Sequence, residues 1–196
     1  MAANDYHFVT TWRIAATPAE ISAVLGDAAE LARWWPSVYL RVRVLEEGDE
    51  RGVGKVVDLW TKGFLPYTLR WRFTVTESNA PHGFRLEAMG DFVGRGIWTL
   101  TPEMDGEAPD GPMTLVSYDW LVIAEKGILK RLSRVIKPIF SANHHWAMAR
   151  GATSLRLELA RRRARGDRLL VAAIPPPPGP TFPHNIRARH RTGPST

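Results

Sequence analysis

Tyr67-Thr-Leu-Arg-Trp-Arg-Phe-Thr-Val-Thr76 is the stretch that decides the fold, because large apolar residues alternate in it with polar ones. Successive side chains of a strand point to opposite faces, so this period of two predicts a strand with one buried face and one wet face. Such a pattern is typical of an antiparallel sheet. The inward face is predicted to carry Tyr67, Leu69, Trp71, Phe73 and Val75, while Arg70 faces outward.

Six further segments have strand-like character, and short turns with Gly, Pro, Asn or Asp separate most of them. They are His7–Ile14, Val38–Leu45, Lys55–Thr61, Gly83–Met89, Arg95–Thr101 and Met113–Ile123. An acidic loop, Glu103–Pro112, joins the last two. The sequence therefore predicts seven antiparallel strands.

The sequence also predicts three helical segments, two short ones near the N-terminus and a long one near the C-terminus. Thr17 is a good N-cap, Pro18 suits the first helical position and Glu20 completes a capping box, so a helix is expected to run to about Leu25. A second short helix is expected over Asp27–Trp34, because Pro36 stops it.

After Lys126 the pattern becomes helical again. A helix is predicted over Ile128–Ile136, and Pro138 interrupts or restarts it. The helix that follows continues to about Arg163, which gives roughly 25 residues and about 38 Å.

The predicted fold class is α+β, with a curved seven-stranded antiparallel sheet around one long C-terminal helix and two short helices. The apolar face of such a sheet needs a cover, and the chain offers few helices for it. Space is therefore expected between the sheet and the long helix, and an apolar cavity is the usual form of a small-molecule site.

Charge is distributed unevenly along the 196 residues. The net charge is +6, but the segment from Arg161 onward holds eight arginines and one acid, so residues 1–160 carry a net charge of −1. A domain over residues 1–163 and an Arg/Pro-rich, disordered tail over 164–196 are predicted. A near-neutral body does not indicate a specific nucleic-acid partner, although the tail could bind RNA weakly.

Composition also bounds the cellular setting. The chain contains no cysteine, which excludes disulfides, thiolate metal sites and cysteine nucleophiles. No apolar run approaches the ~20 residues of a membrane-spanning helix, and the first residues lack the pattern of a secretory signal. A cytoplasmic protein is expected, and its oligomeric state does not follow from the sequence.

Five stretches of the chain carry a family resemblance: Trp12–Glu20, Leu31–Pro36, Gly63–Trp71, Gly90–Trp98 and Asn143–Met148. They resemble the START-like, or SRPBCC, superfamily, which has the helix-grip fold and includes Bet v 1-like proteins, polyketide cyclases/dehydrases and lipid-transfer domains. The resemblance covers roughly residues 6–160. It implies the helix-grip fold and a ligand cavity, but the superfamily includes carriers, sensors and enzymes.

Eight tryptophans are spread along the chain, about one for each predicted element. They either fill a bulky core or form the wall of an apolar cavity. Trp34 and Trp35 are expected to seat the short helices at the cavity mouth. The predicted ligand-binding residues are Trp60, Tyr67, Leu69, Trp71, Phe73, Trp98, Tyr118, Trp120, Asn143 and Trp146.

Asp58 is a weak catalytic candidate. It shares its strand parity with Trp60, and a carboxyl group in an apolar site has a raised pKa, which suits a general acid or base. The alternative is that Asp58 faces water. Asp119 and Arg95 are expected to face outward.

No metal or cofactor is expected. His144 and His145 point about 100° apart on a helix, so both cannot serve one metal from one face. Rieske-type oxygenases share the fold, but their cluster-binding cysteines are absent here. The glycine-rich Gly90–Gly96 stretch precedes a predicted strand and lacks the Lys-Ser/Thr of a phosphate loop, so a hairpin turn is the better interpretation.

The leading functional prediction is binding or transport of a small hydrophobic or amphipathic ligand, lipid-like or polyketide-like. The alternatives are a polyketide cyclase/dehydratase-type enzyme and a membrane-surface or protein-interaction module. The last would use the tail and the basic residues Lys126, Lys130, Arg131, Arg134 and Lys137, which could make weak contact with anionic lipid. A solvated helix face is the simpler interpretation of that basic cluster.

Overall fold

The computed structural model describes residues 5–103, 111–124 and 127–164. Residues 165–196 of the predicted tail and most of the acidic loop lie outside these residues.

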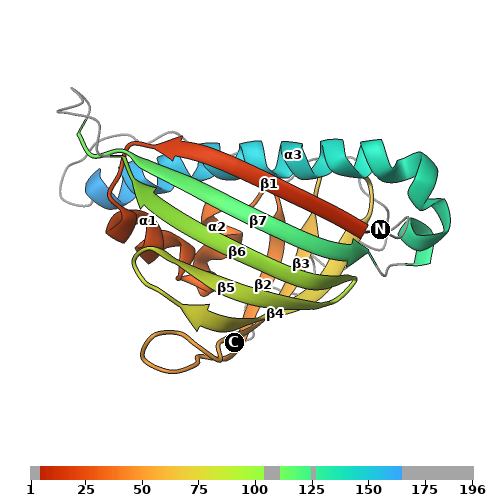
Figure 1. Ribbon diagram of the computed structural model, residues 1–196, viewed down its shortest axis with the longest axis horizontal. Coiled ribbons are helices and arrows are strands. Elements are labelled where there is room, and N and C mark those ends of the chain that lie inside the picture. Colours follow the sequence, from red (N-terminus) through yellow and green to blue (C-terminus); the bar gives the residue numbers. More distant parts are fainter. Residues whose placement is uncertain (1–4, 104–110, 125–126, 165–196) are drawn as a thin grey trace, which may run out of the picture.

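The predicted α+β architecture is confirmed. A seven-stranded antiparallel sheet has the strand order β1-β7-β6-β5-β4-β3-β2, so every consecutive pair except β1 and β2 is adjacent. The long helix α3 runs along the length of the molecule beside β1, and the short helices lie at one end (Figure 1). The strands are β1 Asp5–Ile14, β2 Tyr39–Glu46, β3 Val56–Lys62, β4 Thr68–Ser78, β5 Gly83–Gly90, β6 Phe92–Pro102 and β7 Thr114–Ala124.

The first helix, α1, spans Pro18–Leu25 and begins with the predicted capping box. The Glu20 backbone N–H donates to Thr17 Oγ1 at 3.2 Å, and the Thr17 N–H donates to Glu20 Oε2 at 2.9 Å. The second predicted helix is a 3₁₀ turn, η1 (Ala28–Glu30), followed by one α-turn, α2 (Leu31–Trp34).

The long helix α3 spans Gly127–Arg163 without a break at Pro138, where the sequence indicated an interruption. Proline has a φ that suits a helix, and it removes one backbone donor, so a helix can continue through it with a bend. Figure 1 shows α3 turning at its N-terminal end.

A buried carboxylate fastens the short helices to α3. The Glu158 side chain is 0% exposed, and both its oxygens accept hydrogen bonds from Arg33 on α2, at 2.8 and 2.9 Å. Arg161 donates to it twice at 2.7 Å, and Arg162 Nε donates at 2.8 Å. Three guanidiniums therefore compensate one desolvated charge, which is the condition under which a buried ion pair is tolerated.

Candidate functional site: an aromatic cavity

A cavity of about 230 Å³ lies between the sheet, α3 and the short helices. The sheet contributes most of the wall, with residues from all seven strands, and the helices close the other side. Its lining is mainly apolar, and the aromatic side chains come from elements far apart in the sequence. Among the lining residues are Leu25, Trp35, Leu69, Trp71, Phe73, Phe92, Trp98, Tyr118, Trp120, Phe140 and Met148.

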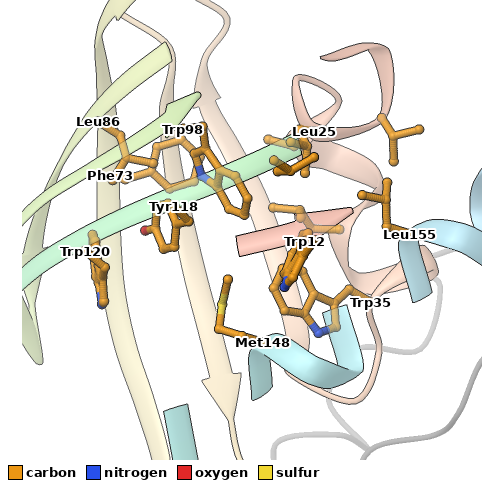
Figure 2. Close-up of a cluster of buried hydrophobic side chains, with 14 of the residues drawn as sticks. Trp12, Leu25, Trp35, Phe73, Leu86, Trp98, Tyr118, Trp120, Met148 and Leu155 are labelled. Atoms are coloured by element: carbon orange, nitrogen blue, oxygen red, sulfur yellow. The ribbon is translucent and has the colours of Figure 1, made fainter. Parts of the chain in front are cut away.

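Three rings form a stacked ladder along one wall. The ring centroids of Trp98 and Tyr118 are 4.2 Å apart at an interplanar angle of 19°, and those of Tyr118 and Trp120 are 5.6 Å apart at 20°. Figure 2 shows this ladder beside β6 and β7, with Met148 of α3 across from it. Trp71 extends the aromatic wall, with its centroid 5.7 Å from that of Trp120.

Gly96 makes room for this ladder. A Cβ at this position would lie 2.7 Å from Tyr118 Oη and 2.9 Å from Trp120 Cε3. Only a residue without a side chain therefore lets the two rings lie flat against β6.

Uncharged hydrogen-bonding groups interrupt the apolar lining. Burial raises the pKa of Tyr39 and Tyr118, so both phenols stay protonated at neutral pH. Thr61 Oγ1 accepts a hydrogen bond from Trp71 Nε1 at 3.0 Å. The two phenols can donate to a ligand, and Thr61 helps to orient the Trp71 ring.

His144 is the other polar group of interest in the lining. Its ring stacks on that of Phe8, with centroids 4.0 Å apart and an interplanar angle of 14°. Burial, and to a lesser extent the nearby His145, lowers the pKa of His144 to about 4. The imidazole is therefore neutral at pH 7. Its Nε2 is buried and has no hydrogen-bond partner among the described residues. A buried polar atom without a partner is uncommon and is open to a ligand.

Two other polar residues of the cavity lining, Asn143 and Lys62, are engaged in hydrogen bonds with the protein itself. Asn143 Oδ1 accepts from the Leu65 N–H at 3.3 Å, which ties α3 to the loop between β3 and β4. Lys62, only 3% exposed, donates from Nζ to the carbonyl oxygens of Leu65 at 3.0 Å and Gly63 at 3.3 Å. These contacts organise that loop.

The opposite end of the cavity is bounded by the loop between β2 and β3. Lys55 Nζ lies 3.4 Å from the Gly26 carbonyl oxygen at the end of α1, and Arg51 Nη2 donates to the Ser78 carbonyl at 2.6 Å. Two long side chains thus tie this loop to α1 and to the end of β4.

Most of the residues predicted to bind a ligand line the cavity. They are Leu69, Trp71, Phe73, Trp98, Tyr118, Trp120 and Asn143. Trp35, predicted to lie at the cavity mouth, lines the cavity and is 3% exposed, whereas Trp34 is fully buried in the core.

Asp58 and Trp60 do not face the cavity, which corrects the inward parity considered for them. Asp58 is 46% exposed and lies 3.6 Å from Arg72. Trp60 lies on the same outer face, where the Arg70 guanidinium covers its ring at 4.8 Å. The inward residues of β3 are Val57, Leu59 and Thr61, so the outward parity of Asp58 is the correct alternative. A shift of one residue moves every side chain to the other face.

Tyr67 and Trp146 also lie outside the cavity lining. Tyr67 belongs to the loop that precedes β4, which begins at Thr68. Trp146 packs against Phe64 with ring centroids 6.0 Å apart, and the Arg150 guanidinium lies 5.6 Å from its ring. Trp146 follows Asn143 by three residues but is rotated about 100° from the cavity-facing Ala147.

Tyr39 was missed because of a β-bulge. Simple alternation in Val38–Leu45 groups Tyr39 with Arg41 and Arg43, but the register with β3 shifts between Tyr39 and Arg41. The extra residue places Tyr39 on the cavity side. No signal in the sequence marks this bulge. For His144, the sequence allowed either histidine of the pair to face the cavity.

No group of three or more His, Cys, Asp or Glu residues suited to a metal occurs in the described part of the chain. Within the same residues, no helix is long and apolar enough to cross a membrane. Asp119, expected to face outward, is 47% exposed and lies 3.0 Å from His7 Nε2.

A curved antiparallel sheet, a long helix and an apolar cavity between them define a helix-grip domain. The sequence model of the family described as polyketide cyclase/dehydrase and lipid transport matches residues 6–159. The chain belongs to this family. A comparison with curated protein sequences gives no significant match.

Solved structures share the fold at low sequence identity. The ZhuI aromatase/cyclase from Streptomyces sp. R1128 has a TM-score of 0.59 and 19% identity, over 84% of this chain and 99% of that chain. The protein TTHA0849 from Thermus thermophilus gives 0.56 and 14%, over 80% and 99%. A norcoclaurine synthase from Thalictrum flavum gives 0.55 and 13%, over 81% and 96%. At such identities the similarity shows the fold alone.

Proposed function

We propose that this protein binds a small, uncharged, largely aromatic ligand in the cavity, as a carrier or sensor does. The observation that carries this proposal is the stacked wall of Trp98, Tyr118 and Trp120 beside neutral hydrogen-bonding groups. Flat rings gain from offset stacking on such a wall, and the phenols and His144 would fix orientation.

The cavity volume limits the size of the ligand. An engineered apolar cavity of roughly 150 Å³ accepts benzene, and typical ligand sites begin at about 300 Å³. A volume of about 230 Å³ lies between these limits and suits a ligand, or a ligand portion, of roughly two fused rings.

A second function, catalysis of the polyketide cyclase/dehydratase type, is favoured by one observation. Tyr39, Tyr118 and His144 converge on the same cavity, and these are the residue types that exchange protons during aldol closure and loss of water. The names of two structural neighbours, an aromatase/cyclase and a norcoclaurine synthase, are enzyme names. The outward position of Asp58 removes it as the acid or base of such a reaction.

Native mass spectrometry of the purified full chain tests the binding proposal, because a co-purified molecule would reveal the ligand class. Titration with 2-naphthol, followed by intrinsic tryptophan fluorescence, tests the cavity directly. Saturable quenching is expected, since the tryptophans of the wall contact the probe.

A pair of variants on α3 locates the binding. Ala147 lines the cavity, whereas Ala149 is exposed two residues further along the helix. Ala147→Phe fills the cavity and is expected to weaken 2-naphthol binding by more than about tenfold, and Ala149→Phe by less than about twofold. Equal effects of the two variants would place the probe elsewhere and contradict the proposal.

A further inference from the structure

Four arginines project from the outer face of the sheet, on the opposite side from the cavity wall. Arg41 and Arg43 belong to β2, and Arg70 and Arg72 belong to β4. We call these four side chains the arginine patch. Between them β3 presents two outward residues, Trp60 and Asp58.

The strand register arranges the patch as two rows. Arg41, Trp60 and Arg70 are direct cross-strand neighbours, and so are Arg43, Asp58 and Arg72. Adjacent strands lie about 4.8 Å apart and a strand rises about 3.4 Å per residue. The four arginines therefore stand at the corners of a rectangle of about 10 by 7 Å at the backbone.

The patch carries an excess of positive charge. Asp58 lies 3.6 Å from Arg72, but no carboxylate of the described residues lies within ion-pair distance of Arg41, Arg43 or Arg70. Elsewhere on the outer face, Arg13 pairs with Glu103 at 2.6 Å and Arg85 pairs with Glu77 at 3.0 Å. Three guanidiniums without a carboxylate partner among the described residues thus gather in one place on a body whose net charge is close to zero.

At the centre of the patch, the Arg70 guanidinium lies over the buried ring of Trp60. This residue is 8% exposed, and the Arg70 guanidinium lies 4.8 Å from its ring. A guanidinium held over an indole loses less freedom on binding than a free one, and its planar fork matches a carboxylate. The arrangement is therefore partly preorganised for carboxylate partners.

We propose that the arginine patch is a docking surface for the acidic face of a helix in a partner protein. Carboxylates at positions i and i+4 of a helix lie about 6 Å apart, and those at i and i+7 lie about 10.5 Å apart along the axis. A helix that lies across the strands can therefore place carboxylates at i and i+7 over the long side of the rectangle, with the carboxylate at i+4 between them. This inference does not depend on the ligand of the cavity.

Three features favour a protein partner over a bilayer or a nucleic acid. The sheet curves around α3, so its outer face is convex and offers a flat bilayer little contact (Figure 1). Trp60, the aromatic residue in the middle of the patch, is covered and so cannot insert into lipid or stack on bases. Exposed apolar side chains border the patch, with Leu45 at 37% and Met89 at 56%, and protein interfaces combine such residues with arginine.

A fluorescein-labelled, alanine-based peptide of about 20 residues, with glutamates on one helical face, is the probe. Fluorescence anisotropy with the full chain is expected to show saturable binding that weakens as salt increases. The double variant Arg41→Glu/Arg70→Glu is expected to lose at least about tenfold in affinity.

Arg13→Glu/Arg85→Glu is the matched control. It changes the net charge by the same amount on the same outer face, and the basic tail is present in both proteins. A loss of less than about twofold is expected for the control. Thermal melts of both variants verify folding, and equal losses in the two variants would overturn the proposal.

An isomeric peptide with its glutamates spread around the helix tests the geometry. It is expected to bind at least about fivefold more weakly, because only two carboxylates can reach the patch at once. Equal binding of the two peptides overturns the proposed fit. The proposal is also overturned if Arg41→Glu/Arg70→Glu leaves peptide binding unchanged, or if it selectively abolishes binding to phosphatidylserine vesicles or an RNA oligomer instead.

Discussion

His144 is expected to make the stability of the folded protein depend on pH. Its pKa is about 4 in the folded protein because of burial and the nearby His145, against about 6.5 for an ordinary histidine. Between pH 4 and 6.5 the unfolded chain therefore binds more protons, so stability rises with pH across this window and is unaffected by His144 above it. The contribution is at most about 3 kcal/mol.

His144→Phe is expected to flatten this part of the stability profile, since phenylalanine can keep the stack on Phe8 without titrating. Urea unfolding at pH 4.5, 5.5 and 7 measures the effect. His145→Gln is the control, because His145 is exposed and is only the lesser cause of the lowered pKa of His144, so most of the slope is expected to remain. A wild-type slope that survives in His144→Phe would contradict the assignment.

Tyr118 is expected to act both through its ring and through its hydroxyl. Tyr118→Phe keeps the stack between Trp98 and Trp120 and removes a protonated phenol. A neutral hydrogen bond contributes about 1 kcal/mol, so affinity for 2-naphthol is expected to fall about fivefold. Affinity for naphthalene, which offers no polar partner, is expected to stay unchanged. Equal losses for the two probes would assign the effect to packing.

Glu158 is predicted to be a main attachment between α3 and α2. Burial raises the pKa of its carboxyl group, but hydrogen bonds from Arg161, Arg33 and Arg162 outweigh this and lower it. Its stabilising contribution is therefore present above about pH 4.5 and is lost as the pH falls below that value. Glu158→Gln leaves three guanidiniums without their charge partner and is expected to cost about 3–5 kcal/mol in the free energy of unfolding.

Glu30→Gln is the matched control for this element. Glu30 also pairs with Arg33, but its side chain is 41% exposed, and exposed pairs contribute less than about 1 kcal/mol. Urea denaturation of both variants at pH 7 gives the comparison. Similar costs would mean that burial does not set the strength of this attachment.

The inward face of a strand was predictable from the sequence where apolar and polar residues alternate regularly, and not where they do not. In β4, polar residues mark one face from Thr68 to Thr76, so Leu69, Trp71 and Phe73 were placed on the cavity side correctly. In β3, the run Val56–Lys62 offers no comparable contrast between its faces, and the parity of Trp60 was taken wrongly. Side-chain chemistry alone does not set the register where both faces are covered, here by the cavity and by arginine side chains.

The capping box and the stop at Pro36 located the short helices because their signals are local. The cavity polar groups depend on longer-range features: a bulge moved Tyr39 inward, and the rotation of α3 selects Asn143 and His144 rather than Trp146. Such rotations follow from packing against the whole sheet, which no local pattern encodes.

At the scale of the whole molecule, the end of α3 is tied to α1 and to the loop that precedes α1. Arg163 donates to both oxygens of Glu20, at 2.7 and 3.0 Å, and to the Ala15 carbonyl at 3.0 Å, while Arg162 reaches the Ala23 carbonyl at 3.1 Å. The hydrogen bond from Arg163 is the main reason that the pKa of Glu20 is lowered to about 2. The contribution of this pair is present above about pH 4.5 and is lost as the pH falls towards about 2.

Two truncations test whether the domain ends where the arginine contacts end. A chain ending at Ala164 keeps the contacts of Arg161, Arg162 and Arg163, and the removed Arg/Pro-rich segment has a composition that cannot bury a core. Its melting temperature is expected to stay within about 2 °C of the full chain, with 2-naphthol binding retained. A chain ending at Ala160 loses all three guanidiniums and leaves Glu158 with Arg33 alone, so its melting temperature is expected to fall by more than about 8 °C. Equal melting temperatures of the two truncated chains would show that the end of α3 does not hold the short helices over the cavity.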